Sequence, residues 1–167
     1  MRAFLVSRPR ELLFLSAWIV GISAGMLTAI GIDDSILPVM RLAASCRVSI
    51  VVLFLMASIP FLITAFAVFI HQYPILLIIC FVRSYGFGCL AWLIVRSFGS
   101  AAWLMQPMIQ FSDGILLVVY VLYGLWHCSH WESNPKRPVL VCMFITAVVT
   151  IIDYLAVSPF LVSLLVS

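Results

Sequence analysis

The sequence predicts an all-α integral membrane protein, a bundle of about five transmembrane helices. Hydrophobic residues make up 65% of the chain and charged residues only 9%, far outside the composition of a soluble domain. Apolar runs of about 20 residues, the length that crosses a bilayer, recur along the chain between short polar stretches. No separate soluble domain fits between them, so we expect a single transmembrane domain over residues 1–167.

Charge and cysteine content argue against several function classes. The net charge of +3 comes from basic residues scattered through the expected loops, where they set membrane topology and form no nucleic-acid-binding surface. The five cysteines lack the spacing of a metal site, and most stand in apolar runs, where cysteine is usually a small apolar side chain. We therefore expect no cofactor, no metal site and no disulfide framework.

The first apolar run, residues 12–32, follows Arg2, Arg8 and Arg10. A basic segment before an apolar run resembles a signal peptide, but this run is too long for one. We expect a retained signal-anchor helix with its N-terminus in the cytoplasm.

Small residues recur at every fourth position of this helix. Such a ridge lets two helix backbones approach closely in lipid. Packing against another helix of the same chain is the favoured interpretation, and a seam in a homo-oligomer is the alternative. Two glycines in the third apolar run suit the same kind of contact. The candidate helix-packing residues are Ala17, Gly21, Gly25, Ala29, Gly86 and Gly88.

Two segments follow the first helix. Asp33 and Asp34 end it, and residues 35–47 have the length and composition of an interfacial amphipathic helix. Residues 48–70 form the second expected span. Pro60 near its middle predicts a kink, because proline removes a backbone donor and crowds the preceding turn.

The third expected span, residues 75–95, contains Arg83, whose charge is costly in hydrocarbon. By the rise of an α-helix, Arg83 lies roughly 12 Å inside the boundary at Pro74, within snorkelling range of its long side chain. The alternative is an ion pair, with either Asp113 or Asp153 as the partner. The sequence leaves all three interpretations open.

The apolar run is broken after the third span. Residues 97–100 interrupt it, and residues 101–111 are too few to cross a membrane. Pro107 disfavours a continuous helix into the next span. We expect a helix break at Gly99 and a short broken or re-entrant helix over about 101–111 that ends near Pro107; an interfacial position is the alternative.

The fourth expected span covers residues 115–126, extended from about Phe111 onward. His127, Cys128 and His130 follow in a polar loop. Their spacing matches no known metal site, so a headgroup-level aromatic belt with Trp126 and Trp131 is the favoured interpretation.

The basic pair at residues 136–137 marks this loop as cytoplasmic. Residues 139–157 form the last expected span, in which Asp153 shares a helical face with two threonines. A Ser-Pro pair at 158–159 interrupts the apolar run and leaves a short tail at or outside the interface. Five spans put the C-terminus outside.

Three motifs, in this order, resemble the stage II sporulation protein M family of small bacterial membrane proteins. They are the glycine-ridged first helix LLFLSAWIVGISAG, the central run FVRSYGFGCLAWLIVRSFGSAAWLMQPMIQF, and IIDYLAVSP near the C-terminus. Two positions depart from the pattern: Met108 stands where the family often has histidine or another polar residue, and Asp153 where glutamate is commoner. The positions that the resemblance implicates are Arg83, Gly86, Gly99, Pro107, Asp153 and Pro159.

The resemblance implies a non-enzymatic scaffold in a bacterial cell membrane. In spore formers the family member joins peptidoglycan-degrading partners that remodel the wall during engulfment. The expected partners are therefore membrane lipids and other membrane proteins, with cell-wall hydrolases among them, and no nucleic acid.

The residues themselves leave two function classes in view. A scaffold is favoured by the glycine ridge, the short extramembrane stretches and the lack of a nucleophile–base pair. The alternative is a small transporter or channel subunit that uses Arg83, Asp113 and Asp153, since discontinuous helices at the membrane midplane recur in ion and substrate sites. No motif supports a paired-aspartate protease, so we expect no enzyme.

Overall fold

The computed structural model describes residues 9–38, 49–69, 72–129 and 136–166, and its elements are helical throughout these ranges. The α-helices are α2 (Pro9–Ile30), α4 (Ile50–Phe69), α5 (Tyr73–Phe98), α6 (Ala102–Ile109), α7 (Phe111–Ser129), α8 (Lys136–Ile152) and α9 (Ser158–Val166). Two 3₁₀ turns (Asp34–Ile36 and Gly99–Ala101) and a π-helical segment (Asp153–Val157) complete the described elements.

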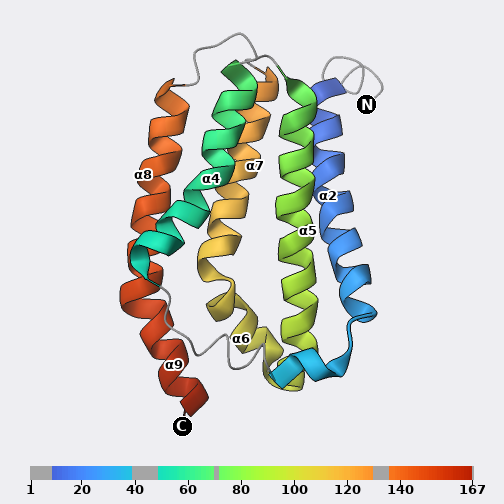
Figure 1. The fold of residues 1–167 in the computed structure, drawn as a ribbon, viewed down its shortest axis with the longest axis vertical. Coiled ribbons are helices and arrows are strands. Elements are labelled where there is room, and N and C mark those ends of the chain that lie inside the picture. Colours follow the sequence, from blue (N-terminus) through green and yellow to red (C-terminus); the bar gives the residue numbers. More distant parts are fainter. Residues whose placement is uncertain (1–8, 39–48, 70–71, 130–135, 167) are drawn as a thin grey trace.

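Five stretches of the described chain are long and apolar enough to cross a membrane, as the composition predicts. Figure 1 shows α2, α4, α5, α7 and α8 along the long axis of the molecule, with α6 and α9 at the end where α5 and α8 finish. The protein is therefore an all-α, multi-pass membrane bundle. The five stretches are Pro9–Ile30, Ile50–Ala67, Tyr73–Ile109, Phe111–Cys128 and Arg137–Ser163.

Helices α2 and α5 pack closely enough that their backbones touch, and glycines make this contact possible. A Cβ atom at Gly21 would lie 2.7 Å from a backbone carbonyl oxygen of α5. A Cβ at Gly25 would overlap the Tyr85 carbonyl oxygen, and one at Gly88 would overlap that of Ile22. In lipid, such close approach is a main source of helix association. We call this contact the α2–α5 seam.

The remaining small residues of the predicted ridge behave differently from one another. Ala29 is buried, whereas Ala17 is only partly buried. Gly86 lies outside the seam, since a Cβ there would meet nothing within 4 Å. Because α5 of the same chain occupies the glycine face of α2, that face is not open to a second copy of the protein.

An aromatic core joins α2, α4 and α7. The rings of Phe61 and Tyr120 meet edge to face with centroids 5.7 Å apart, and Phe14 approaches Tyr120 with centroids 6.3 Å apart. The Tyr120 hydroxyl is hydrogen-bonded to Thr64 Oγ1 at 2.9 Å, which satisfies both buried groups. Gly124 provides the space for the Phe14 ring, which a Cβ there would overlap.

Helix α4 contains Pro60 and bends midway along its length in Figure 1. Proline leaves the carbonyl four residues earlier without its usual donor and crowds the preceding turn, which bends a helix. The bent helix contacts α5, α7 and α8.

Helix α5 ends at Phe98, and the chain turns at Gly99, whose φ of 55° is a conformation that side-chain-bearing residues rarely adopt. After a 3₁₀ turn, α6 is about 12 Å long by its helical rise, too short to cross a membrane. Pro107 lies within α6, which ends two residues later, and Gln110 separates α6 from α7.

The last span does not stop at the Ser-Pro pair, contrary to the expectation from the sequence. The chain widens into the π segment, in which the Ser158 N–H donates to the Asp153 carbonyl, five residues back. In a regular α-helix the ring of Pro159 would clash with the Leu155 carbonyl, and a wider turn relieves that clash. The proline is therefore accommodated within a helix that continues as α9.

The structure describes only part of the predicted interfacial helix and corrects the predicted polar loop after the fourth span. Of the predicted interfacial helix, residues 39–47 lie outside the described residues, and Asp34–Ile36 forms a 3₁₀ turn. His127 and Cys128 belong to the end of α7 and not to a loop, because α7 continues beyond the predicted span. His130 lies outside the described residues.

The α2–α5 seam predicts that one added methyl group lowers stability at one glycine and not at another. Gly25→Ala forces α2 away from the Tyr85 carbonyl, and overpacking of this kind costs about 1–3 kcal/mol. Gly86→Ala is the matched control, because its methyl group enters open space. Thermal unfolding of the purified variants in one detergent should give a lower Tm for Gly25→Ala alone. Equal Tm values for the two variants would contradict the seam.

Candidate functional site

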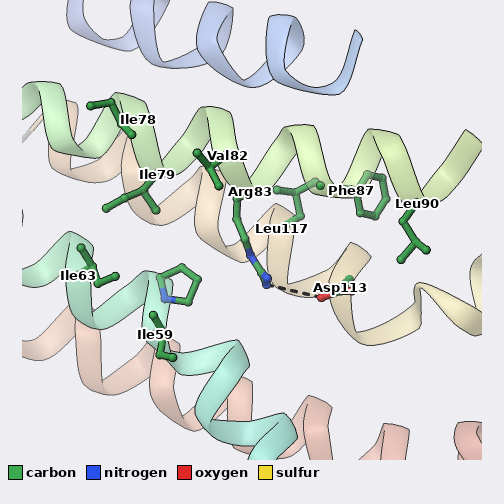
Figure 2. A pocket seen from close by; sticks show the side chains of 12 residues that line it. Ile59, Ile63, Ile78, Ile79, Val82, Arg83, Phe87, Leu90, Asp113 and Leu117 are labelled. Atoms are coloured by element: carbon green, nitrogen blue, oxygen red, sulfur yellow. Dashed lines mark ion pairs between the residues drawn. The ribbon is translucent and has the colours of Figure 1, made fainter. Parts of the chain in front are cut away.

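An ion pair links α5 to the start of α7 inside the bundle. Arg83 extends from α5 towards Asp113, as Figure 2 shows, and its Nη2 atom lies 3.7 Å from Asp113 Oδ1. The Arg83 side chain is 23% exposed and that of Asp113 is 50% exposed. A charge in hydrocarbon usually has a partner. The sequence left open whether Arg83 snorkels or pairs with Asp113 or Asp153, and the structure shows the pair with Asp113.

The same turn of α7 also contacts Asp153 of the last span, through Ser112. Ser112 Oγ donates a hydrogen bond of 3.2 Å to Asp153 Oδ2. Ser112 directly precedes Asp113, so one turn of α7 is joined to α5 on one side and to the last span on the other. Asp153 is also the first residue of the π segment. We call Arg83, Ser112, Asp113 and Asp153 the polar cluster.

The Arg83–Asp113 pair lines a cavity of about 450 Å³ between α4, α5 and α7. The rest of its wall is mostly apolar, and Figure 2 shows these side chains around the pair. A mostly apolar pocket of this size with a few polar groups is typical of a small-molecule site. The apolar lining includes Ile59, Pro60 and Ile63 of α4, Ile78 and Val82 of α5, and Leu117 of α7.

The histidine at the other end of α7 belongs to the core. His127 is buried, and its ring lies edge to face with those of Tyr123 and Trp126, at centroid distances of 4.5 and 4.8 Å. It is therefore a core side chain near the end of α7 and not part of the polar loop in which the sequence interpretation placed it. In the described ranges there is no group of three or more His, Cys, Asp or Glu side chains that could hold a metal ion.

Arg96, which the sequence interpretation assigned no partner, binds the end of α2. Its Nη1 atom donates to the carbonyl oxygens of Ala29 at 2.9 Å and Ile32 at 2.7 Å, and its guanidinium also pairs with Asp34. The final carbonyls of a helix lack intrahelical partners and carry a partial negative charge. Since α2 has no basic residue in its own last turn, the arginine from α5 supplies the compensating charge.

The sequence contained a signal for this contact. In a five-span chain the first and third spans end on the same side of the membrane, so Arg96 and the acids after the first span were candidates to meet. For Gln110 the signal was weaker, because it was only a polar residue within an apolar run. It is 3% exposed, and its Nε2 donates to the Phe87 carbonyl at 3.1 Å, which joins the α6–α7 junction to α5.

The polar cluster predicts non-additive effects of charge removal. Arg83→Met or Asp113→Leu leaves one ion in an apolar setting without its partner, so each should lower the Tm of the purified protein. The double variant removes both charges and should be more stable than the sum of the two single losses implies, with a coupling of about 0.5–3 kcal/mol. Additive losses would contradict a functional ion pair between these residues.

Arg96 predicts a second stability difference. Arg96→Leu removes the donors to the last carbonyls of α2 and should lower the Tm clearly, since hydrogen bonds to charged groups contribute about 1.5–3 kcal/mol. Asp34→Asn, which changes only the exposed end of the same network, should have a small effect. A Tm lowered as much by Asp34→Asn as by Arg96→Leu would argue against the role of Arg96 as a helix cap.

Comparison with known proteins gives no match: no family model, no curated protein and no solved structure matches the chain. The resemblance to the stage II sporulation protein M family therefore stays a prediction from its motifs. The positions that it implicates are spread over the structure. Arg83 and Gly86 line the cavity, Gly99 joins α5 to α6, and Asp153 begins the π segment that accommodates Pro159.

Proposed function

We propose that this chain is an integral membrane scaffold that organises partner proteins in a bacterial cell membrane, as its resemblance to the stage II sporulation protein M family implies. One observation supports this most: the intramembrane charges are bound to neighbouring helices of the same chain. Arg83 pairs with Asp113, and Asp153 accepts a hydrogen bond from Ser112. Charges used in this way fix the arrangement of helices, which suits a protein that presents a constant surface.

The surface available to partners is the lipid-facing side of the helices. On α8, Leu140 and Phe144 are 68% and 71% exposed, and Leu155 of the π segment is 67% exposed. Another membrane helix can pack on such a face, since association in lipid depends on shape and close contact. A second copy of the chain and a membrane-anchored cell-wall hydrolase are the partners that the proposal includes.

We assign the start of α2 to the cytoplasm and the end of α9 to the outside. Arg10 and the Lys136–Arg137 pair stand at the end of the bundle where α2 and α8 begin. At the other end, Arg96 is engaged by Asp34 and the end of α2. An excess of basic residues marks the cytoplasmic side. In this orientation α6 lies at the outer face, as a re-entrant or interfacial helix beside partners that act on the wall.

The scaffold proposal predicts a stable partner in the native membrane. The tagged full-length chain, crosslinked in its own host and purified in mild detergent, should enrich a peptidoglycan hydrolase identified by mass spectrometry. An unrelated five-span protein with the same tag is the control. Equal recovery of the hydrolase with both proteins, or its absence from both, would contradict the proposal.

A small transporter or channel subunit is the second candidate, because the Arg83–Asp113 pair lines a cavity large enough for a small molecule. In proteoliposomes, the scaffold proposal predicts no flux of common ions above that of empty vesicles. Flux that is present with the wild-type chain and lost in Arg83→Gln and Asp153→Asn would favour transport instead.

A further inference from the structure

The cavity between α4, α5 and α7 opens towards the lipid. Its rim on α4 is formed by Ile59 and Ile63, which are 45% and 43% exposed, and its rim on α5 by Ile78 and Val82, both 61% exposed. Leu117 of α7, 4% exposed, contributes a buried part of the wall. Since the rim is apolar and exposed within the expected spans, a hydrocarbon chain can enter sideways from the bilayer.

The dimensions of the cavity suit one such chain and not a helix. Its lining on α5 extends from Ile78 to Leu90, about 18 Å along the helix axis by the α-helical rise. A helix about 10 Å wide would fill about 1,400 Å³ over that length. The cavity holds about 450 Å³, so a whole partner helix does not fit inside it.

The ion pair determines which head group the cavity accepts. The separation of 3.7 Å between Arg83 Nη2 and Asp113 Oδ1 exceeds hydrogen-bond length. Arg83 Nη2 is buried and makes no hydrogen bond to any residue that the structure describes. A group between the two side chains should accept from the guanidinium and donate to the carboxylate. A hydroxyl does both. Asp113 would repel an anionic head group, and Arg83 an ammonium group.

We propose that this cavity is a binding site for a neutral amphiphile, a single hydrocarbon chain with a hydroxyl head group of the long-chain alcohol type. The tail lies along the apolar wall, and the hydroxyl bridges Arg83 and Asp113. This inference does not rest on the scaffold proposal, because a scaffold and a transporter can each hold such a lipid.

The test uses the full chain in phosphatidylcholine nanodiscs and a long-chain alcohol that carries a photoreactive diazirine in its tail. Labelled peptides, mapped by mass spectrometry, should come from α4, α5 and α7 around the cavity. Dodecanol, dodecanoate and dodecylammonium share one tail and serve as competitors. Dodecanol should compete about tenfold better than the other two, a ratio that corresponds to about 1.4 kcal/mol of preference.

Two variants separate the tail site from the head-group site. Gly86→Leu adds a side chain to the cavity wall, at a position where a Cβ meets nothing within 4 Å. It should abolish labelling at the cavity while its Tm stays near that of the wild type. Leu27→Phe, on an exposed face of α2, is the control and should label normally.

The double variant Arg83→Gln with Asp113→Asn keeps the volume of the site and removes its charges. It should still be labelled, but the preference for dodecanol over dodecanoate and dodecylammonium should fall to about twofold or less. Unchanged labelling of Gly86→Leu, or stronger competition by the anion or the cation, would overturn the proposal. Labelling that falls as more protein is packed into each bilayer would overturn it in favour of a second copy in the cavity.

Discussion

The backbone contact between α2 and α5 is the constraint on which the other contacts of the bundle depend. With Gly25 and Gly88 in the seam, no side chain keeps the two helices apart. Only at this separation does Arg96 of α5 reach the last carbonyls of α2. The same approach carries Phe14 of α2 into the aromatic core around Tyr120. The close glycine contact therefore positions Arg96, and the hydrogen bonds of Arg96 then hold the two helices together.

Polar contacts determine how the helices are rotated and placed relative to one another, which apolar packing alone specifies only loosely. Lipid chains are as apolar as leucine, so helices in a bilayer gain little from burying hydrocarbon against one another. Two consecutive residues of α7, Ser112 and Asp113, bind different helices and so fix both the rotation and the depth of α7. The cavity lies beside this turn and is bounded on α4 by Pro60, whose kink belongs to the same region.

The sequence specified the helices better than it specified their partners. Hydropathy located the five spans, and the break at Gly99 was predictable because glycine, serine and a short run coincide there. Pro159 was misleading, since a wider turn in the helix accommodates it and the span continues. The choice of Asp113 over Asp153 as the partner of Arg83 needed coordinates. It depends on how α6 returns the chain to α7, and no helical periodicity contains that information.

The α2–α5 seam also has a consequence for how the protein is made. About 60 residues, including all of α4, separate Gly25 from Tyr85, so α2 enters the membrane before its partner has been synthesised. At about 5–20 residues per second, this interval lasts roughly 3–12 s. During it the glycine face of α2 is without α5, at a stage when an insertion factor or a neighbouring nascent helix can cover it. The glycine face of α2 is thus open to other helices only until α5 has packed against it.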